Sequence, residues 1–529
     1  MKEGFFGRSG HLELLAKRSK AFLDGYRQNI AIIGAETTGK TALIAHFTKQ
    51  LSDNRLITVY LEAREESFAS FTRRFIGILL FSFLSNSGRP IKEDLDFLIN
   101  KSDGYIPHTC QRIRHILETP AKNRKSSLFG ELLSLSESLR AESGKSCLII
   151  FDEFHLLEKT WTKGLYKEWS KALLTQKNTM YIITSSQVSL ARAILSKELA
   201  LLFGNFELVP LEPFDIPAAG AFLEWQLAPL RINADTKNFL VHFTGGYPFY
   251  LQLMAQALQD SPEDDIAQAM ERLFVGPSGV LGQRFHNFLR RISEINRYGE
   301  SINILYLVTS GKNKLKEISH ALRKPKDKLT GAINQLIEAD ALSRRADFLT
   351  VNDRLFGFWL KFIYRQRQQA LIPDAAGERE RFREYLENEI QEFILNSHKE
   401  VSERMRELMG LFEDDMAQLE KRKIRLTQFR EIKTTEFGSL TASKGLIGRS
   451  SESLWIMAVK KGPLCEEDIA EFSRECRKYR HKNQKRIIVT LSEIDHNTRL
   501  KALEEKIWAW DIRHLNQMLD LYSKPWVVA

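Results

Sequence analysis

The sequence predicts a multidomain α/β protein that opens with a parallel sheet covered by helices. Three observations predict this fold class. The 529 residues are enough for about three or four domains. Up to residue 207, short β-branched runs alternate with helical patterns, which is typical of a parallel sheet. The first of these runs ends in a glycine-rich turn at Gly34–Thr41, where a helical pattern begins.

The first domain, residues 1–207, is expected to contain four strands joined by amphipathic helices. The runs that predict strands are residues 29–33, 56–61, 147–151 and 180–184. The helical patterns are residues 41–51, 67–84 and 128–142. A polar interval at residues 85–102 is expected to be a surface insertion. From Leu208 onward the alternation stops.

Three further domains are expected after this point. Residues 208–295 read as consecutive helices, including 218–230 and 250–258. Residues 296–370 give three helices and a β pair at 342–351, followed by a linker at 365–376. Residues 371–529 form a second α/β domain. Its expected elements are helices at 379–397 and 400–423, strands at 453–459 and 486–491, a helix at 499–506 and a strand at 507–512.

Composition excludes several classes of protein. Hydrophobic residues at 43 % and charged residues at 27 % describe a globular chain and exclude disorder or collagen. Four cysteines without a C-x-x-C pair fit a reducing, cytoplasmic setting. The first twenty residues have no apolar region of the secretory kind. The longest apolar stretch, residues 75–84, is about half the length that spans a bilayer, so a buried helix and no membrane partner are expected.

The glycine-rich turn fits the phosphate-loop pattern G-x-x-x-x-G-K-[ST], between a strand and a helix as that pattern requires. Backbone N–H groups of such a turn and the helix dipole favour phosphate. Gly39 permits close approach, Lys40 is expected to contact the β- and γ-phosphates, and Thr41 offers a hydroxyl to Mg²⁺. The alternative is a glycine-rich turn with an exposed lysine. The expected nucleotide contacts are Gly34, Ala35, Glu36, Thr37, Thr38, Gly39, Lys40, Thr41 and Ala42.

A second half of this site is expected where the strand 147–151 ends in Asp152 and Glu153. Open α/β sheets bind ligands at the carboxyl ends of their strands. Asp152 suits Mg²⁺ coordination through water, and Glu153 suits polarisation of an attacking water. The strand 180–184 continues into hydroxyl residues, of which Ser185 is a candidate sensor of the γ-phosphate; a capped strand-to-helix turn is the alternative.

Several motifs together resemble the archaeal-type ATPases of the STAND branch of the AAA+ superfamily. The resemblance covers residues 5–365 and includes Phe5-Phe-Gly-Arg8, the phosphate loop, the Asp152-Glu153 strand, the Thr184–Ser186 strand, Thr244-Gly-Gly-Tyr-Pro248 and residues 351–359. It implies a P-loop NTPase sheet, ATP and Mg²⁺ as cofactors and a helical lid at 208–295. It also fits the winged helix that the order of three helices and a β pair predicts at 296–370.

The same resemblance implies roles for residues outside the phosphate loop. Arg8 is expected near the base and ribose, and Gly245, Gly246 and Pro248 over the nucleotide. Glu36 stands where the family commonly has a basic residue, which disfavours phosphate unless its side chain points outward. Arg192 is a candidate trans-acting finger or a solvated helical arginine. His46, His155 and His242 are expected to pack or lie on the surface, and a nucleotide-dependent homo-oligomer is left open.

Positive charge is concentrated in residues 311–370, which contain thirteen Lys or Arg and only six Asp or Glu. Helices at 315–322 and 327–339 joined by Arg323-Lys-Pro-Lys326 are compatible with a helix-turn-helix, and Arg344 and Arg345 lie at the turn of a wing. Double-stranded DNA is therefore a candidate partner, because phosphate contacts need only such cations. A basic face that is merely solvated is the alternative.

The last domain resembles the PD-(D/E)XK nuclease-like fold, which includes restriction endonucleases. That chemistry needs an Asp on one strand and an acid-x-Lys on the next. Here Ala458 occupies the acid position before Lys460, residues 437–443 contain no Asp, and Glu389, Glu392 and Glu436 do not replace the pair. Nuclease activity is not expected. The basic runs 421–425 and 477–486 suit an anionic partner such as double-stranded DNA, or are a solvated face.

Two functions follow from the sequence. The first is a STAND/AAA+-type switch that binds and hydrolyses ATP and couples its nucleotide state to the winged helix and a C-terminal effector module. The alternative is a nucleotide-gated DNA-binding regulator or defence scaffold with little turnover. The preference for ATP over GTP rests on the resemblance alone.

Overall fold

The computed structural model describes most of the chain, in two compact units. The units are Met1–Phe214 with Tyr247–Phe249, and Asp215–Gly246 with Tyr250–Ala529. The described residues are 4–85, 93–119, 127–160, 164–199, 206–228, 230, 232–261, 265–275, 279–295, 300–369, 374–420, 422–437 and 444–528.

The first unit is built on a parallel sheet of five strands in the order β2-β3-β4-β1-β5. Its strands are β1 (Asn29–Ile33), β2 (Leu56–Glu62), β3 (Ser146–Asp152), β4 (Thr179–Ser185) and β5 (Phe206–Pro210). The four predicted strands are found within a residue of their expected ends. The fifth, β5, was not predicted, because it is a half-exposed edge strand without a continuous apolar run. All five strands end at one edge of the sheet.

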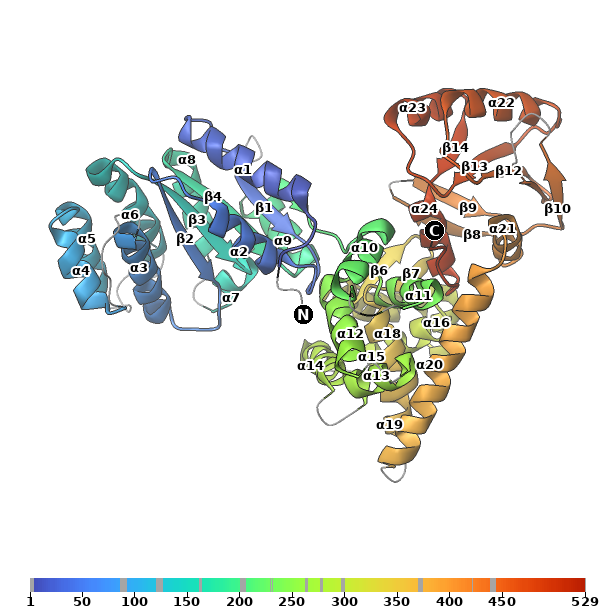
Figure 1. Cartoon of the computed structure of the whole chain (residues 1–529), viewed down its shortest axis with the longest axis horizontal. Coiled ribbons are helices and arrows are strands. Elements are labelled where there is room, and N and C mark those ends of the chain that lie inside the picture. Colours follow the sequence, from blue (N-terminus) through green and yellow to red (C-terminus); the bar gives the residue numbers. More distant parts are fainter. Residues whose placement is uncertain are drawn as a thin grey trace. The chain divides into compact units, whose positions relative to one another are not determined.

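Helices cover both faces of this sheet (Figure 1). The strand residues alternate between two apolar clusters: Ile30 and Ile32 face one, and Ala31 and Ile33 face the other. The first cluster is closed by α1 (Ser9–Leu23) and α2 (Lys40–Gln50). The second is closed by α3 (Phe68–Ser85), α4 (Leu95–Asp103), α5 (Pro107–Glu118), α6 (Ser127–Ser143), α8 (Leu165–Thr175) and α9 (Val188–Lys197). After β3 come two short turns, η2 (Phe154–Leu156) and α7 (Leu157–Thr160).

Helix α3 contains the longest apolar stretch of the sequence. Among the described residues it is the one helix long and apolar enough to cross a bilayer by length and composition. In the structure its Phe71, Phe75 and Leu79 have no exposed surface and belong to the core of the first unit. The expectation of a buried helix is therefore confirmed. Of the expected insertion at 85–102, residues 86–92 lie outside the described part, and α4 begins at Leu95.

The second unit begins with helices, as predicted after residue 208. They are α10 (Ile216–Gln226), α11 (Ala234–Thr244), α12 (Pro248–Asp260), α13 (Ile266–Phe274) and α14 (Val280–Ile295). The predicted order of three helices and a β pair follows: α15 (Glu300–Thr309), α16 (Leu315–Leu322), α17 (Lys326–Glu338), β6 (Leu342–Arg345) and β7 (Phe348–Val351). Next come α18 (Arg354–Trp359), a π-helical turn η3 (Leu360–Tyr364) and α19 (Arg365–Gln369). The expected linker at 365–376 thus begins as helix, and residues 370–373 lie outside the described part.

The chain ends in a module built on a mixed sheet in the order β10-β11-β12-β13-β14. Strands β10, β11 and β12 pair antiparallel, whereas β12, β13 and β14 pair parallel. The module contains α20 (Ala375–Ser397), α21 (Val401–Met409), β8 (Asp415–Leu419), β9 (Arg422–Leu426), β10 (Glu431–Glu436), β11 (Lys444–Arg449), β12 (Leu454–Lys460), α22 (Glu466–Arg477), β13 (Gln484–Thr490), α23 (His496–Glu504), β14 (Ile507–Trp510) and α24 (Ile512–Leu521).

The helix predicted at residues 400–423 is wrong beyond Met409. Residues 415–419 and 422–426 pair as strands β8 and β9 instead, and Glu420, which follows β8, has φ +51°. Burial alternates along both strands, with Ala417, Leu419, Ile424 and Leu426 in the core. Lys423 and Arg425, two of the charged residues that made the segment read as a helix, are exposed on the other face of β9.

Candidate nucleotide-binding site

The phosphate loop begins where β1 ends in the interior of the sheet. A Cβ atom on Gly34 would lie 2.1 Å from the backbone oxygen of Leu211, so only glycine fits there. Gly39, immediately before α2, has φ +93°. This backbone conformation favours glycine because a Cβ atom would be strained there. Thr37 also takes a positive φ, +67°. Both glycines of the motif are therefore required by the local backbone, and the loop turns sharply into the N-terminus of α2.

Lys40 is folded back over this loop. Its Nζ donates to the backbone oxygens of Gly34 at 2.9 Å and Ala35 at 2.8 Å. The side chain is buried, with 5 % of the residue exposed. Burial lowers the pKa of Lys40, and the nearby carboxylates of Glu153, Asp152 and Glu36 oppose that effect. The alternative of an exposed lysine in an ordinary turn is therefore wrong, since the ammonium is held inside the curve of the loop.

Thr41 and Asp152, the two predicted metal ligands, are in contact. The Thr41 hydroxyl donates to Asp152 Oδ2 at 2.8 Å. Asp152 is 2 % exposed at the end of β3 and also accepts hydrogen bonds from Tyr60 at 2.7 Å and from Thr184. Burial and the bond to Asp152 raise the pKa of Tyr60, which keeps the phenol protonated as a donor. A hydroxyl and a carboxylate are hard oxygen donors, and this pair fits a Mg²⁺ ion that keeps most of its waters.

Glu153 follows directly, in the left-handed region at φ +54°. Its Oε2 accepts hydrogen bonds from the Ser186 N–H and hydroxyl, both at 2.8 Å, and lies 3.3 Å from His155 Nδ1. Burial raises the pKa of Glu153, and the bonds from Ser186 and the charge of Lys40 oppose this rise. The carboxylate that was predicted to polarise water is therefore anchored to the end of β4, close to the loop lysine.

Ser185 contacts neither acid. Its hydroxyl is fully buried, bonds His155 Nδ1 at 2.8 Å and lies 3.2 Å from the Gln187 backbone oxygen. Its neighbours Thr184 and Ser186 are the residues at the end of β4 that contact Asp152 and Glu153. The sensing role of Ser185 stays a prediction. His155 does more than pack, because it joins the Ser185 hydroxyl to Glu153.

Arg8 lies beside the phosphate loop. Its guanidinium donates to the backbone oxygens of Thr38 at 3.3 Å and Glu212 at 2.5 Å, and lies 4.6 Å from the centre of the Phe214 ring. Arg8 itself has φ +61° immediately before α1. The segment that begins the resemblance is thus fixed against the loop, and the expected role of Arg8 near the base and ribose stays a prediction.

For the remaining predicted residues of the site, the structure gives a position in the fold. Glu36 is half-buried in the loop, and Ala42 is exposed on the first turn of α2. Pro248 begins α12, after Gly245 and Gly246 at φ +63° and +76°. Arg192 is exposed on α9. The roles of these residues at the nucleotide stay predictions.

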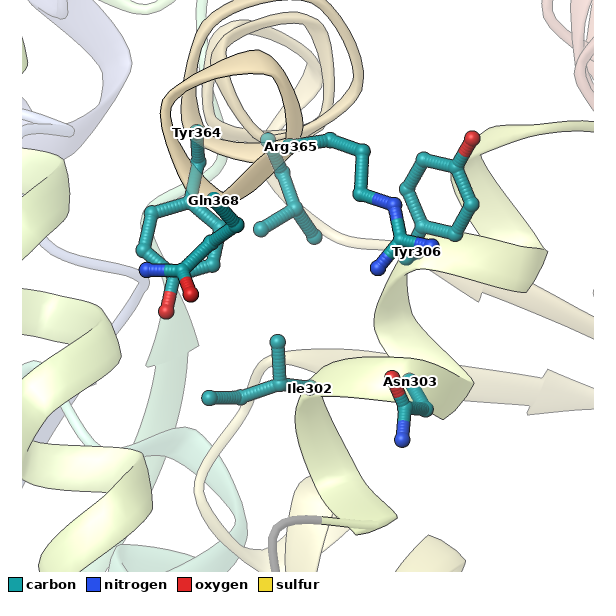
Figure 2. A pocket seen from close by; sticks show the side chains of 7 residues that line it. Ile302, Asn303, Tyr306, Tyr364, Arg365 and Gln368 are labelled. Atoms are coloured by element: carbon teal, nitrogen blue, oxygen red, sulfur yellow. The ribbon is translucent and has the colours of Figure 1, made fainter. Parts of the chain in front are cut away.

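The second unit has a small pocket of about 200 Å³ that carries none of the predicted site residues (Figure 2). It lies between α15 and the segment η3–α19. The guanidinium of Arg365 lies 4.7 Å from the centre of the Tyr306 ring, so its charge is already engaged. The other lining residues are Ile302, Asn303, Leu360, Tyr364 and Gln368.

The C-terminal module lacks the acidic residue that a nuclease-like site would need two positions before Lys460. Ala458 is fully buried and pairs with Gly445 of β11, while Lys460 forms an ion pair with Asp468 of α22. Burial raises the pKa of Glu389, which lies on α20 4.0 Å from Lys361. Among the described residues there is no group of three acidic, histidine or cysteine side chains that could hold a metal ion.

Comparison with known proteins bears on the fold of the first unit. Residues 4–183 match the sequence model of the family described as AAA ATPase domain. A Walker-type ATPase of Pyrococcus abyssi is 18 % identical with a TM-score of 0.51, over 68 % of this chain and 97 % of that one. An ORC2 protein of Aeropyrum pernix is 12 % identical, over 74 % and 96 %, with a TM-score of 0.40. No curated protein sequence matches the chain significantly. The N-terminal part is therefore a parallel-sheet α/β fold of the P-loop NTPase type.

Proposed function

We propose that the chain is a switch ATPase: it binds ATP with Mg²⁺ at the phosphate loop, hydrolyses it, and passes the nucleotide state to the second unit. One observation carries the proposal. Thr41 of the loop and Asp152 of β3, which are 111 residues apart in sequence, meet at 2.8 Å beside a buried lysine. The match of residues 4–183 to the AAA ATPase domain family supports the choice of ATP.

The residues present define the roles in such a reaction. Lys40 would exchange its bonds to the backbone oxygens of Gly34 and Ala35 for bonds to phosphate oxygens. Thr41 and Asp152 would hold Mg²⁺, which neutralises charge on the β- and γ-phosphates when bound. Glu153 would accept a proton from the attacking water, and its raised pKa makes it a stronger base. To reach that water, Glu153 must loosen its two bonds to Ser186.

In the second unit, we propose that α15–α17 and the β6–β7 hairpin form a winged helix that transmits the switch to the C-terminal module. The tip of the hairpin is docked on that module: Ala346 bridges Ala417, and Asp347 exchanges hydrogen bonds with Met416 at 2.7 and 3.1 Å. Phe348 belongs to the apolar core of the module. A movement of the three helices would therefore be carried to the C-terminal sheet.

Nucleotide binding and turnover by three forms of the full chain test the proposal. The wild type is expected to bind and hydrolyse ATP in Mg²⁺. Lys40→Ala should lose binding, because the phosphates lose their buried cation. Glu153→Gln should bind ATP and lose turnover by about 10²–10⁴-fold. ATP binding retained by Lys40→Ala would contradict the assignment of the loop. Equal, very slow turnover by wild type and Glu153→Gln would favour the nucleotide-gated scaffold over the ATPase.

A second candidate function is binding of double-stranded DNA through α16 and α17. Arg323, Lys326 and Lys328 are exposed at the turn between these helices, where a recognition helix begins. Arg344 is exposed as well, but the hairpin that carries it is partly covered by β8. Helix α17 is therefore the more accessible element.

A gel shift with the full chain and a duplex tests this second function. Binding should weaken with salt, and changing Arg323, Lys326 and Lys328 together to Ala should lower the slope of log K against log[salt] by about 2.7, since each phosphate contact contributes about 0.9. Absence of duplex binding at low salt would remove this function and leave the ATPase untouched.

A further inference from the structure

A second pocket of the C-terminal module brings together the two basic runs of its sequence. It has a volume of about 490 Å³ and lies where β9 packs beside the beginnings of β13 and β14. Six of its twelve lining residues are cationic. They are Arg422, Lys423, Arg425, Lys485, Arg486 and Lys506. The other six are Ile424, Gln484, Ile487, Leu503, Ile507 and Trp508, so no acid lines it.

Most of this charge is not neutralised. Within the described part of the chain, Arg422, Lys423 and Lys506 are exposed and no ion pair involves them. Arg425 forms ion pairs with two residues that do not line the pocket, Glu452 at 2.9 Å and Asp414 at 3.5 Å. The pKa of Lys485 is lowered by burial and by the charge of Arg425. Like charges held this close favour an anion between them, because the anion relieves their repulsion.

The pocket also has an aromatic wall. Trp508 is half-buried at the start of β14, and its ring is supported by Trp510 at a centroid distance of 5.9 Å. Leu503, 48 % exposed, lies on the same lining. Lys485 reaches across the fully buried ring of Trp455 at 4.7 Å and donates to the Arg425 backbone oxygen at 2.7 Å. A fixed indole among cations suits a flat ring that carries phosphate.

This pocket is separate from the position that a nuclease-like site would occupy. Lys460 pairs with Thr490 at the carboxyl end of β13, whereas Gln484 and Arg486 lie at its beginning. Four to six residues of strand separate the two places, or about 13–20 Å. The absence of acidic residues around Ala458 therefore does not affect ligand binding in this pocket.

We propose that this pocket binds single-stranded nucleic acid, with its cations on consecutive phosphates and a base stacked on Trp508. A duplex offers phosphates but keeps the faces of its bases covered, whereas an unpaired strand offers both. The concave shape and the half-buried indole therefore favour the single strand. The site lies outside the first unit and does not require ATP.

Fluorescence anisotropy with the full chain, without nucleotide, tests the charges. The probe is a labelled 15-residue oligothymidylate. The variant Arg422→Gln/Lys506→Gln should weaken binding and lower the slope of log K against log[salt] by about 1.4, since each contact to a single strand contributes about 0.7. The control Lys433→Gln/Lys478→Gln removes the same charge from residues paired with Glu431 and Glu475. The control should keep the wild-type slope; an equal change in both variants would overturn the proposal.

The aromatic wall is tested by substitutions at Trp508. Trp508→Leu keeps an apolar side chain but removes the stacking face, and should weaken binding about fivefold or more, whereas Trp508→Phe should retain most of it. Thermal unfolding of each variant shows whether the module is still folded. Equal affinity of folded Trp508→Leu and wild type would overturn the stacking role.

Competitors identify the ligand. Unlabelled oligothymidylate should displace the probe, and an equal concentration of duplex or of inorganic pyrophosphate should not. Displacement by pyrophosphate alone would show a site for small phosphates, and preference for the duplex would show a groove for double strands; either result would overturn the proposal. Because no ATP is present, these outcomes are independent of the phosphate loop.

Discussion

At the scale of single residues, Gly34 and Gly10 offer a matched test of the phosphate loop. Gly34→Ala places a methyl group 2.1 Å from the Leu211 backbone oxygen, so the loop must move. We expect loss of ATP binding and destabilisation of about 1–3 kcal/mol. Gly10 lies on α1, where a methyl group would meet nothing within 4 Å, and Gly10→Ala should leave binding intact and stabilise by up to about 1 kcal/mol. Calorimetric titration and urea unfolding measure both effects.

Glu153 provides a prediction about pH. Because burial raises its pKa in the folded chain, the native state holds this proton to a higher pH than the unfolded state. The free energy of unfolding therefore falls as pH rises from the usual Glu pKa to the raised one, by about 1.4 kcal/mol for each pH unit between the two pKa values. Glu153→Gln cannot ionise and should be more stable than wild type at neutral pH.

The measurement is urea unfolding of both forms without nucleotide at pH 4 and pH 7.5. The advantage of Glu153→Gln should be present at the higher pH and shrink at the lower one, where the wild-type side chain is mostly protonated in both states. An advantage of equal size at both pH values would show that ionisation of Glu153 is not its source.

Residue types alone predicted part of the candidate site. The phosphate loop and the Asp152-Glu153 pair were recognisable because their neighbours in sequence define them. Tyr60, Thr184 and Ser186 were not recognised as partners of these acids, since each contact joins strands far apart in sequence, such as the 92 residues between Tyr60 and Asp152. Only the strand order β2-β3-β4 brings them together.

At the scale of elements, burial decides which strands the sequence could predict. Strands β1, β3 and β4 are buried along their whole length and read as apolar runs. Strands β5 and β10 lie at sheet edges, where β5 is half-exposed and β10 is largely exposed, so their composition resembles that of loops. Strand β11 contains Gly445 and Gly448, where a Cβ would meet the rings of Phe437 and Phe429. Glycine weakens a strand signal, although here close packing requires it.

A buried ion pair lies beside the contact between the β6–β7 hairpin and the C-terminal module, because its lysine, Lys314, precedes α16 and bridges Phe348 of β7. Lys314 Nζ lies 2.6 Å from Asp415 and 2.9 Å from Glu413. Burial lowers the pKa of Lys314, but the bonds to Asp415 and Glu413 outweigh it and raise the pKa overall. Asp415→Asn leaves this lysine with the exposed Glu413 as its closest carboxylate, and should destabilise the second unit by about 1–3 kcal/mol.

Asp414 is the matched control for this substitution. It is the preceding residue, has φ +63°, which Asn tolerates, and pairs with Arg425 near the surface at 3.5 Å. Asp414→Asn should cost less than about 1 kcal/mol. Urea unfolding of the two variants compares them. Asp415 also pairs with Lys316 at 2.9 Å, so equal stabilities would mean that neither lysine pair of Asp415 contributes much to the stability of the second unit.

At the scale of the whole molecule, the chain consists of two units with separate apolar cores. The clusters around β1–β4 belong to the first unit, and those around β12–β14 belong to the second. Units with their own cores can unfold independently, so scanning calorimetry is expected to resolve two transitions. The phosphate loop, Asp152 and Glu153 all lie in the first unit.

ATP with Mg²⁺ should therefore raise the transition of the first unit, by about 2.7 kcal/mol of stability at a concentration a hundredfold above its Kd. The same addition to Lys40→Ala should raise neither transition, since that variant keeps both cores but lacks the buried cation.

The second transition distinguishes a switch from a domain that only binds nucleotide. If the nucleotide state is passed on, ATP must also shift the unfolding of the second unit, because a ligand changes the stability of a unit only through an energetic coupling to it. A second transition that stays fixed while the first one rises would show that the two units are uncoupled, and would remove the switch from the proposed function while leaving ATP binding in place.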